Sequence, residues 1–373
     1  MKKILMVGPV PPPTGGIASV MEDIIHSELA SEFSFELFPR QDFQLRITRT
    51  IPRNIGRIKQ FVNFFLKLWC GNYYLVQIHS SEGAFRGTIL FILLSRLART
   101  DVLLHMHGAD WDRFYTRRSA LGRLYIWIGL RITPRIVVLY SRWAENIRKL
   151  CPRANVLVIR NLIHDQDPPD PSKVQQMKEQ LGLTEEHFVV LTIGYVGWNK
   201  GNFVILNAIP QVVSQDQSIR FVLVGSEEMP GEMAQLMEQV RKENLGSWVT
   251  FTGEVERSKT ALFYSFADAY LLPSFSEGMP ISIIEALRSG LPVISTRVGG
   301  IPDMIEDHVS GLLLNPGAPN EIAEAVLLLR KDQRLRKKLA EGARRTFENK
   351  FEFSRGVEEI RAVYRSFEKP TIK

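Results

Sequence analysis

The most telling part of this sequence reads Ser274-Phe275-Ser276-Glu277-Gly278-Met279-Pro280-Ile281-Ser282-Ile283-Ile284-Glu285-Ala286-Leu287. The apolar run at residues 270–272 predicts the end of a buried strand, and the apolar spacing from Ile281 onward predicts a helix. We expect Pro280 at the first helical position, because its fixed φ suits that place. Gly278 permits a sharp turn and a close approach of a ligand to the backbone. The stretch therefore predicts a junction at which a strand passes into a helix.

Two carboxylates, Glu277 and Glu285, flank this junction with seven residues between them. The free N–H groups of a helix start favour a phosphate. We expect Glu277 in the loop at the mouth of a site, and Glu285 more than one turn into the helix, where it can accept hydrogen bonds from sugar or ribose hydroxyls. The alternative is a loop carboxylate and a solvated helix residue, which spacing alone would favour. The surrounding Ser-Glu-Gly-Met-Pro and the adjoining strands favour a site.

The junction resembles the E-x7-E motif of retaining glycosyltransferases of family 4, also called glycosyltransferase group 1. The resemblance implies that Glu277 contacts the donor sugar and that Glu285 contacts the nucleotide ribose. It also implies that the backbone between them lies near the sugar and the diphosphate, at Gly278, Met279, Pro280 and Ile281.

A glycine loop, residues 194–201, follows the first strand of the second half and opens a helix. Such a loop with a lysine at its end can hold a diphosphate. It is similar to the family's Gly-Arg-x-x-x-x-Lys-Gly, with Gly194 and Lys200 in place, but Tyr195 stands where the family has Arg. The resemblance therefore implies one expected charge fewer at the leaving group. The alternative for Lys200 is a solvated lysine at a helix start.

Two further loops are similar to donor-binding loops of the family. Gly15 and Gly16 follow the first strand, and the resemblance places such a pair near the donor phosphates or the acceptor. A tight turn without a ligand is an equal rival there. The backbone at Thr252 and Gly253 corresponds to the place where the family contacts the nucleobase.

Histidines mark strand ends in the first half. His107 resembles the family histidine that contacts the transferred sugar, whereas a lone histidine is more often structural. Asp110 lies close by in sequence, and His79 ends the preceding strand; we assign both to an acceptor, Asp110 by proximity alone.

The whole chain of 373 residues is long enough for two domains. Strand patterns alternate with helical patterns in both halves, which predicts parallel sheets wrapped by helices. The strands are expected at 3–8, 33–38, 74–79, 102–107, 136–140 and 156–159, then at 188–193, 220–224, 249–251, 269–272, 293–295 and 312–314. Helical patterns in the first half fall at 17–30, 54–70, 84–98, 117–130 and 141–150, and the last helix at 353–367.

The expected fold class is α/β, and the resemblance implies the GT-B fold. This means two Rossmann-like, doubly wound domains facing across a cleft, with the C-terminal helix crossing back to the first domain. We expect an acceptor-side domain at residues 1–165 plus 353–373, and a nucleotide-sugar domain at 166–352, joined at a proline-rich linker. Two cysteines give no disulfide framework, and no apolar stretch reaches the length of a spanning helix.

Charge is unevenly spread. The chain carries +7, but residues 1–160 hold 23 Lys and Arg against 11 Asp and Glu. Basic and aromatic helical patterns at 53–69 and 117–131 can lie on an anionic membrane. The alternative is that their apolar residues pack on the sheet and the arginines are solvated. No nucleic-acid motif accompanies the charge, so no nucleic-acid partner is expected.

We expect a retaining glycosyltransferase that moves a sugar from a nucleotide-sugar, a UDP-sugar, to a glycan or lipid-linked acceptor in cell-surface polysaccharide or glycolipid assembly. The expected catalytic residues are Glu277, His107 and Lys200. No cofactor is expected, since the nucleotide-sugar is a substrate. No obligatory metal is expected either. The expected location is the cytoplasm, peripheral on the inner face of the membrane. The rivals are a non-catalytic sugar-nucleotide or glycan-binding protein on the same fold, and an epimerase or phosphorylase.

Overall fold

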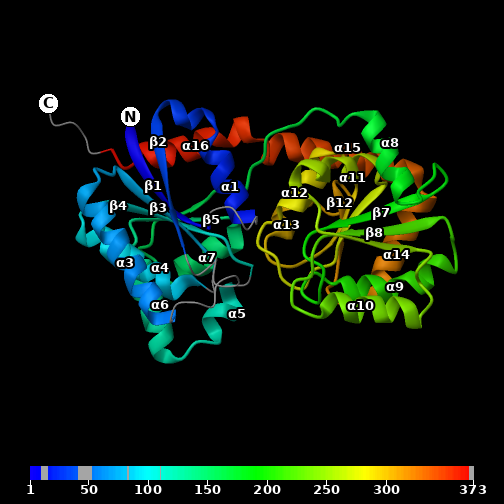
Figure 1. Cartoon of the computed structure of the whole chain (residues 1–373), viewed down its shortest axis with the longest axis horizontal. Helices are drawn as coiled ribbons and strands as arrows, with labels where there is room; N and C mark the ends of the chain where they lie inside the picture. The colour runs from blue at the N-terminus through cyan, green and yellow to red at the C-terminus, as the bar shows by residue number, and fades with distance from the viewer. Residues whose placement is uncertain (10–15, 41–52, 82–83, 110, 369–373) are drawn as a thin grey trace. The chain divides into compact units, whose positions relative to one another are not determined.

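The chain folds as two compact units (Figure 1). The computed structural model describes residues 1–9, 16–40, 53–81, 84–109 and 111–368. Unit 1 comprises Met1–His164 and Phe353–Lys373, and unit 2 comprises Asp165–Glu352. Each unit is built on one six-stranded sheet in which all the described pairings are parallel.

The sheet of unit 1 has the strand order β2-β1-β3-β4-β5-β6. Its strands are β1 Lys2–Gly8, β2 Phe33–Pro39, β3 Leu75–Ser80, β4 Asp101–Met106, β5 Arg135–Val138 and β6 Val156–Val158. Its helices are α1 Gly16–Ile25, η1 Glu28–Ser31, α3 Arg53–Cys70, α4 Phe85–Leu97, α5 Trp111–Thr116, α6 Ala120–Ile132, α7 Ser141–Leu150 and α16 Phe353–Arg365. The strands are apolar because both faces of the sheet are covered by helices.

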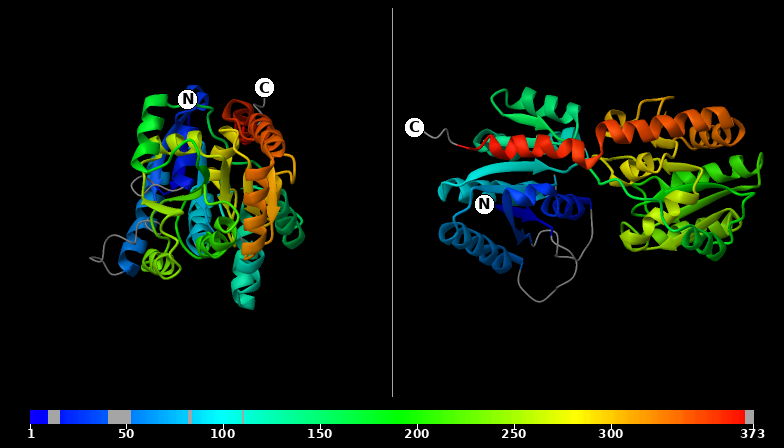
Figure 2. Two further views of the ribbon diagram at one scale, coloured as in Figure 1. Left: turned by 90° about the vertical axis from the view of Figure 1, so that its right-hand side faces the viewer. Right: turned by 90° about the horizontal axis from the view of Figure 1, so that it is seen from above.

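The two faces of this sheet carry different helices. Right-handed crossovers that move from β2 to β3 and on to β4 and β5 place α3, α4 and α6 on one face. α3 contacts α4, and α4 contacts α6. Figure 2 shows the strands lying between α3 and the C-terminal helix α16, which covers the other face.

The C-terminal helix α16 belongs to unit 1, as expected for a chain that crosses back. Its buried Tyr364 donates a hydrogen bond to Gln77 Oε1 on β3. The Tyr74 hydroxyl donates to the Tyr364 carbonyl at 2.6 Å, and the Phe33 ring packs edge-on against the Tyr364 ring. Residues far apart in sequence are thereby joined in one core.

The sheet of unit 2 has the order β12-β11-β10-β7-β8-β9. Its strands are β7 Phe188–Ile193, β8 Ile219–Val224, β9 Val249–Gly253, β10 Ala269–Leu272, β11 Val293–Thr296 and β12 Gly311–Leu314. Its helices are α8 Pro171–Gln180, α9 Asn202–Val213, α10 Glu232–Lys242, η3 Arg257–Lys259, α11 Thr260–Phe266, α12 Ile281–Arg288, α13 Ile301–Met304, α14 Pro319–Lys331 and α15 Gln333–Lys350. α9 and α14 pack together over the core strands.

Strand order in unit 2 reverses between β7 and β10. β8 and β9 extend the sheet on one side of this pair, while β11 and β12 extend it on the other. The helices that follow β7 and β10, α9 and α12, therefore lie on opposite faces of the sheet, and open α/β sheets bind ligands at the carboxyl ends of the strands at such a reversal.

Three sequence expectations need correction. Pro280 is the N-cap of α12, with φ −67° and ψ 123°, and the helix begins at Ile281, so Pro280 is not the first helical residue. The pattern at 117–130 gives α6 from Ala120, after a separate α5. The pattern at 17–30 divides into α1 and the 3-10 turn η1.

Replacing Tyr364 by Ala should destabilise unit 1 by about 3–5 kcal/mol, because truncating a buried aromatic leaves a cavity and removes the bond to Gln77. Urea unfolding followed by circular dichroism measures this. Leu97→Ala, at an exposed position of the same unit, is the control and should change stability by under about 0.5 kcal/mol. Equal effects of the two variants would contradict a structural role for α16.

Candidate functional site

The loops after β7 and β10 lie against one another at the reversal of strand order. β10 pairs with β7 through Ala269 and Val190, so the two strands end side by side. The Phe275 N–H donates to the Asn199 carbonyl at 2.8 Å. Gly201 has φ +74°, and a Cβ there would lie 2.1 Å from the Pro273 carbonyl oxygen. Only glycine permits this approach, so the loop sequence itself sets how closely the two segments meet.

Lys200 and Glu277 form an ion pair across these loops. The Lys200 ammonium Nζ lies 2.6 Å from Glu277 Oε1. The buried Ser274 hydroxyl donates to the same oxygen at 2.8 Å. Glu277 is only 6% exposed, so the carboxylate expected at the mouth of a loop is in fact a buried charge held by a cation and a hydroxyl.

A second carboxylate, Glu228, also acts on Lys200. Burial raises the pKa of Glu228, and the nearby Lys200 charge opposes that rise. The lysine therefore lies in the field of two acidic side chains, Glu277 and Glu228. An anionic ligand that drew the ammonium away would leave these carboxylates to bind hydroxyl donors.

The glycine loop before Lys200 is held by α9 and α10. The Gly197 N–H donates to Asn202 Oδ1 at 2.8 Å, and the Trp198 N–H donates to Glu232 Oε1 at 3.2 Å. A Cβ on Gly197 would lie 2.2 Å from Glu232 Oε2, so any other residue there would displace this carboxylate. The loop is thus fixed by side chains before any ligand binds.

Three glycines line the neighbouring strand ends. Gly194, Gly225 and Gly253 follow or end β7, β8 and β9, and the Gly225 N–H donates to the Gly253 carbonyl at 2.9 Å. Gly225 has φ +142°, and a Cβ there would lie 1.8 Å from the Gly194 oxygen. The Thr252 hydroxyl donates to the Gly253 carbonyl. These contacts hold the backbone segments after β7, β8 and β9 close together.

Glu285 lies on α12, five residues into the helix as counted from Ile281. It is buried, and the Tyr264 hydroxyl lies 3.1 Å from two acceptors, Glu285 Oε2 and the Ser282 carbonyl oxygen, which share its proton. Burial and the Glu285 charge together raise the pKa of Tyr264, so the phenol remains a donor. Met279 is buried in the preceding loop, and the Gly278 carbonyl accepts from the Gly300 N–H at 2.9 Å.

Tyr195 stands 47% exposed in the loop after β7. Position 195 carries a tyrosine and no arginine, and Lys200 forms the ion pair with Glu277. The indole of Trp198 stacks on Phe203, with ring centroids 4.1 Å apart.

In unit 1, three histidines gather at the carboxyl ends of β3 and β4. His79 Nδ1 lies 2.9 Å from His107 Nε2. The His105 ring stacks on the His107 ring, with centroids 4.2 Å apart. Parallel pairing places His79 opposite His105, so both side chains project from the same face of the sheet. Gly16 begins α1 in the same unit, whereas Gly15 and Asp110 lie outside the described residues.

All three imidazoles are held neutral. Burial lowers the pKa of His105 to about 3. Burial, with His105 beside it, holds the pKa of His79 well below 6.5. Burial and both neighbouring rings do the same for His107.

A metal ion does not fit the rings as they are oriented. One ring nitrogen of each histidine lies within 4.8 Å of the others. The planes, however, are only 17°, 29° and 36° apart, and in-plane lone pairs of nearly parallel rings do not converge on one ion. Asp-x-Asp spacing, a common metal-binding pattern, occurs at 110–112 and 165–167. The first lies where side chains are not described, and in the second Asp165 is paired with Arg344.

Sequence reasoning missed the residues that orient the carboxylates. The Ser274 hydroxyl donates to Glu277. A polar residue so soon after an apolar strand could have indicated a place in the site. Tyr264 reaches Glu285 from a different helix, α11, and Glu232 reaches the glycine loop from α10. Nothing in the sequence pattern marks those two.

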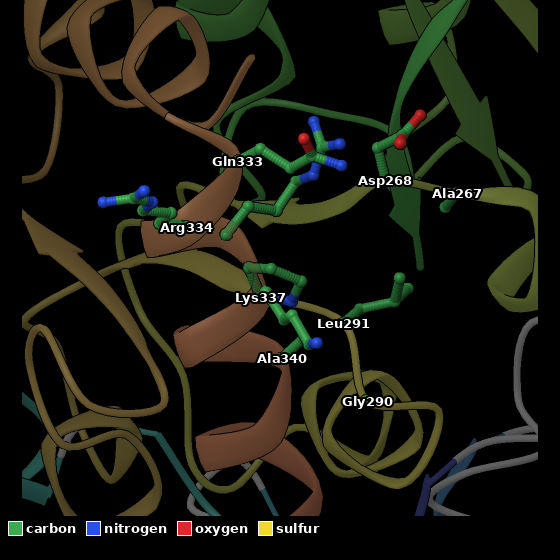
Figure 3. A pocket seen from close by; sticks show the side chains of 10 residues that line it. Ala267, Asp268, Gly290, Leu291, Gln333, Arg334, Lys337 and Ala340 are labelled. Carbon is green, nitrogen blue, oxygen red and sulfur yellow. The ribbon is translucent and has the colours of Figure 1, made fainter. Parts of the chain in front are cut away.

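A separate hollow of about 450 Å³ opens at the amino ends of strands β10 and β11 in unit 2 (Figure 3). Asp268 and Leu291 line it just before β10 and β11 begin. Figure 3 shows the Arg334 side chain directed away from Asp268. Since ligand crevices of such sheets lie at the carboxyl ends of the strands, this hollow is not the candidate site.

Residues 173–346 match the family model described as "Glycosyl transferases group 1". An uncharacterised glycosyltransferase of Methanocaldococcus jannaschii is 24% identical over 373 residues, covering 97% of each chain. UDP-Gal:alpha-D-GlcNAc-diphosphoundecaprenol alpha-1,3-galactosyltransferase of Escherichia coli is 23% identical over 88% of this chain and 91% of its own length. The crystal structure of Anabaena HepE in complex with UDP-glucose superposes with a TM-score of 0.80 at 19% identity, over 98% of this chain and 100% of HepE. The architecture is therefore the expected GT-B fold.

The neutral histidines predict acid sensitivity of unit 1. Their pKa values are far below the ordinary 6.5 of an unfolded histidine, so the unfolded chain binds more protons once the pH falls below about 6.5. Stability should be fully present above pH 7 and fall by about 1.4 kcal/mol per pH unit for each histidine between pH 6.5 and 5.

Urea unfolding at several pH values measures this slope. His105→Gln should reduce it, whereas His26→Gln, at an exposed position of the same unit outside the cluster, should leave it unchanged. A slope indifferent to His105→Gln would show that the cluster is not neutral in the folded state.

Proposed function

We propose that the protein is a retaining glycosyltransferase, because residues 173–346, nearly all of unit 2, match the family model of the glycosyl transferases group 1. It transfers a sugar from a UDP-sugar to a hydroxyl of a glycan or lipid-linked acceptor in cell-surface polysaccharide or glycolipid assembly. The observation that carries the proposal is the ion pair between partly buried Lys200 and buried Glu277 at the reversal of strand order.

The donor class is supported by similar proteins. HepE was solved in complex with UDP and with UDP-glucose, and the E. coli relative is a UDP-Gal-dependent galactosyltransferase that acts on a diphosphoundecaprenol-linked sugar. Those ligands belong to those proteins. For this chain, the proposal of the same donor class rests on the loops after β7 and β10. The first loop contains Lys200, and the second contains Glu277 and leads into α12, whose free N–H groups favour a phosphate.

These residues can stabilise the charges that develop on the sugar and the diphosphate during the reaction. The bond between the sugar's anomeric carbon and the diphosphate breaks, the sugar becomes oxocarbenium-like, and negative charge grows on the diphosphate. Lys200 and the amides at the start of α12 stabilise that charge. Lys200 leaves Glu277 to do so, and Glu277 then accepts hydrogen bonds from sugar hydroxyls. The acceptor hydroxyl attacks from the leaving-group side, and a donor phosphate oxygen takes its proton. No covalent nucleophile, cofactor or obligatory metal is part of this proposal.

Other residues bind the nucleotide. Glu285 accepts hydrogen bonds from the ribose, with its orientation fixed by Tyr264. The backbone at Thr252 and Gly253 contacts the nucleobase. His107, in unit 1, supplies a hydrogen bond to substrate.

Glu277→Ala and Lys200→Ala should each lower kcat/KM for a UDP-sugar by about a hundredfold or more, because each removes a charge required when the leaving group departs. Release of UDP from a panel of UDP-sugars with lipid-linked acceptors, with and without EDTA, measures this. Lys242→Ala, at an exposed site on α10, is the matched control and should retain activity. Binding of UDP-sugars without turnover by the wild type would favour the non-catalytic alternative, for which Tyr195 in place of the family arginine is the supporting observation.

We also propose that unit 1 binds the surface of an anionic membrane, on the cytoplasmic inner face. α3, α4 and α6 lie side by side (Figure 1) and expose many apolar side chains. We call these the α3–α4–α6 surface: Ile58, Val62, Leu66, Trp69, Leu90, Leu93, Leu97, Leu121, Leu124, Tyr125, Trp127 and Ile128. An exposed apolar patch across three helices is unusual for a monomeric soluble protein and marks an interaction site.

The positive charge of these three helices favours an anionic partner. α3, α4 and α6 contain Lys and Arg but no Asp or Glu. Lys59, Arg96 and Arg131 form no ion pair with any residue that the structure describes. Cations beside exposed Trp and Leu suit anionic headgroups over an acyl layer, each cation contributing about 1 kcal/mol near such a surface. Among the described residues no helix is long and apolar enough to span a bilayer, so the contact is with its surface.

The double variant Trp69→Ser with Leu121→Ser should lose most of its binding to vesicles that contain anionic phospholipid, because it removes the two most exposed apolar side chains of the α3–α4–α6 surface. Flotation with anionic and with neutral vesicles, at low and high salt, measures this. Met237→Ser, an exposed apolar site in unit 2, is the control and should bind as the wild type does. Equal flotation with neutral vesicles, or none with either, would contradict the proposal.

A further inference from the structure

The contact between His79 and His107 uses one of the two ring nitrogens of His107. His79 Nδ1 and His107 Nε2 are 2.9 Å apart, so one of them carries a proton and the other accepts it. His79 and His105 are buried, whereas His107 is partly exposed. The atom that His107 can offer to a ligand is therefore Nδ1. Whether Nδ1 is a donor or an acceptor depends on where His79 holds its own proton.

The proton of His105 can be placed from its neighbours. Gln77 Oε1 accepts from the Tyr364 hydroxyl, which turns Gln77 Nε2 toward His105 Nδ1, 3.4 Å away. An amide N–H only donates, so His105 Nδ1 is the acceptor and the His105 proton lies on Nε2. That Nε2 is buried without a hydrogen-bond partner. The cluster already holds one unpartnered N–H.

His79 Nε2 is also buried without a hydrogen-bond partner. If His107 donated to His79 Nδ1, the neutral His79 would carry its proton on Nε2, and the cluster would bury two unpartnered N–H groups. If His79 Nδ1 donates to His107, its Nε2 is a lone pair instead. Buried N–H groups without an acceptor are rarer in folded proteins than buried acceptors without a donor, so we favour the second arrangement.

We propose that His79 is a positioning residue that donates from Nδ1 to His107 Nε2 and so fixes the His107 proton on Nδ1, making His107 a hydrogen-bond donor to an oxygen atom of the substrate. The substrate part of this inference rests on the proposed function; the proton arrangement does not. Ligand oxygens of the proposed donor that accept a hydrogen bond are those of sugar hydroxyls and phosphates.

The arrangement limits what His107 does. A ring with its proton on Nδ1 and its Nε2 occupied has no free lone pair, so it does not remove a proton from an acceptor hydroxyl. Burial keeps the pKa of His107 well below 6.5, so the ring stays neutral at physiological pH and donates as a dipole rather than as a cation.

Nitrogen NMR of the ligand-free, full-length protein tests the proton arrangement directly. With 15N-histidine labelling, long-range 1H–15N spectra distinguish a protonated from an unprotonated ring nitrogen for each of the seven histidines, assigned with single-site variants. We expect protonated Nδ1 in His79 and His107. A His107 ring protonated on Nε2 overturns the inference, whether or not the protein has transferase activity. A titration with Zn²⁺ in the same spectra should leave the three rings unchanged, and specific loss of their signals would also overturn it.

Two variants test the positioning role. His79→Asn keeps an N–H donor near the position of Nδ1, and His79→Leu removes it. We expect His107 to stay protonated on Nδ1 in His79→Asn and to become a mixture of tautomers in His79→Leu. In the transferase assay, kcat/KM should fall about tenfold in His79→Leu and be largely retained in His79→Asn, at equal thermal stability. Equal loss in both variants, or loss in neither, overturns the positioning role. An inactive wild type whose His107 is protonated on Nδ1 refutes the proposed function alone.

Discussion

The ion pair between Lys200 and Glu277 depends on a single topological constraint. Strand order in unit 2 reverses between β7 and β10, so the loops after these two strands meet although 77 residues separate Lys200 from Glu277. Gly201 permits the close approach to the Pro273 carbonyl, and the Ser274 hydroxyl donates a hydrogen bond to the Glu277 carboxylate. α12 begins at Ile281, directly after the loop that contains Glu277. The chemistry proposed for the donor follows from this one adjacency.

The two faces of the unit 1 sheet differ in the side chains and helices that they carry. One face carries α3, α4 and α6, whose outer side chains are apolar and whose only charges are positive. Residues that project toward the other face include Gln77, which bonds to Tyr364 of α16, and His79, which contacts His107. Alternation along β3 makes this division possible, since Gln77 and His79 share one side of the strand. An exposed apolar and basic helix surface and a hydrogen-bonded polar cluster thus lie on opposite sides of the same strands.

Local patterns predicted the elements well where a short segment sufficed. β7 and β10 have the bounds that their apolar runs indicate, and α7 spans the residues that its periodicity predicts. Errors arose where a pattern was ambiguous within a few residues. Pro280 suits both the N-cap and the first helical turn, and the structure has it at the N-cap. The helical pattern at 117–130 began three residues before α6, and α5, which lies outside that pattern, was not predicted.

The sequence by itself determined the parallel α/β architecture, the junction around Glu277, and the lysine at the end of a glycine loop, because each is written in residues close together along the chain. Only the tertiary structure decided that Glu277 is a buried ion-pair partner, that Tyr264 holds Glu285, and that His79 contacts His107. Those contacts join residues from different strands and helices. Their distances depend on strand order and register, which no local pattern specifies.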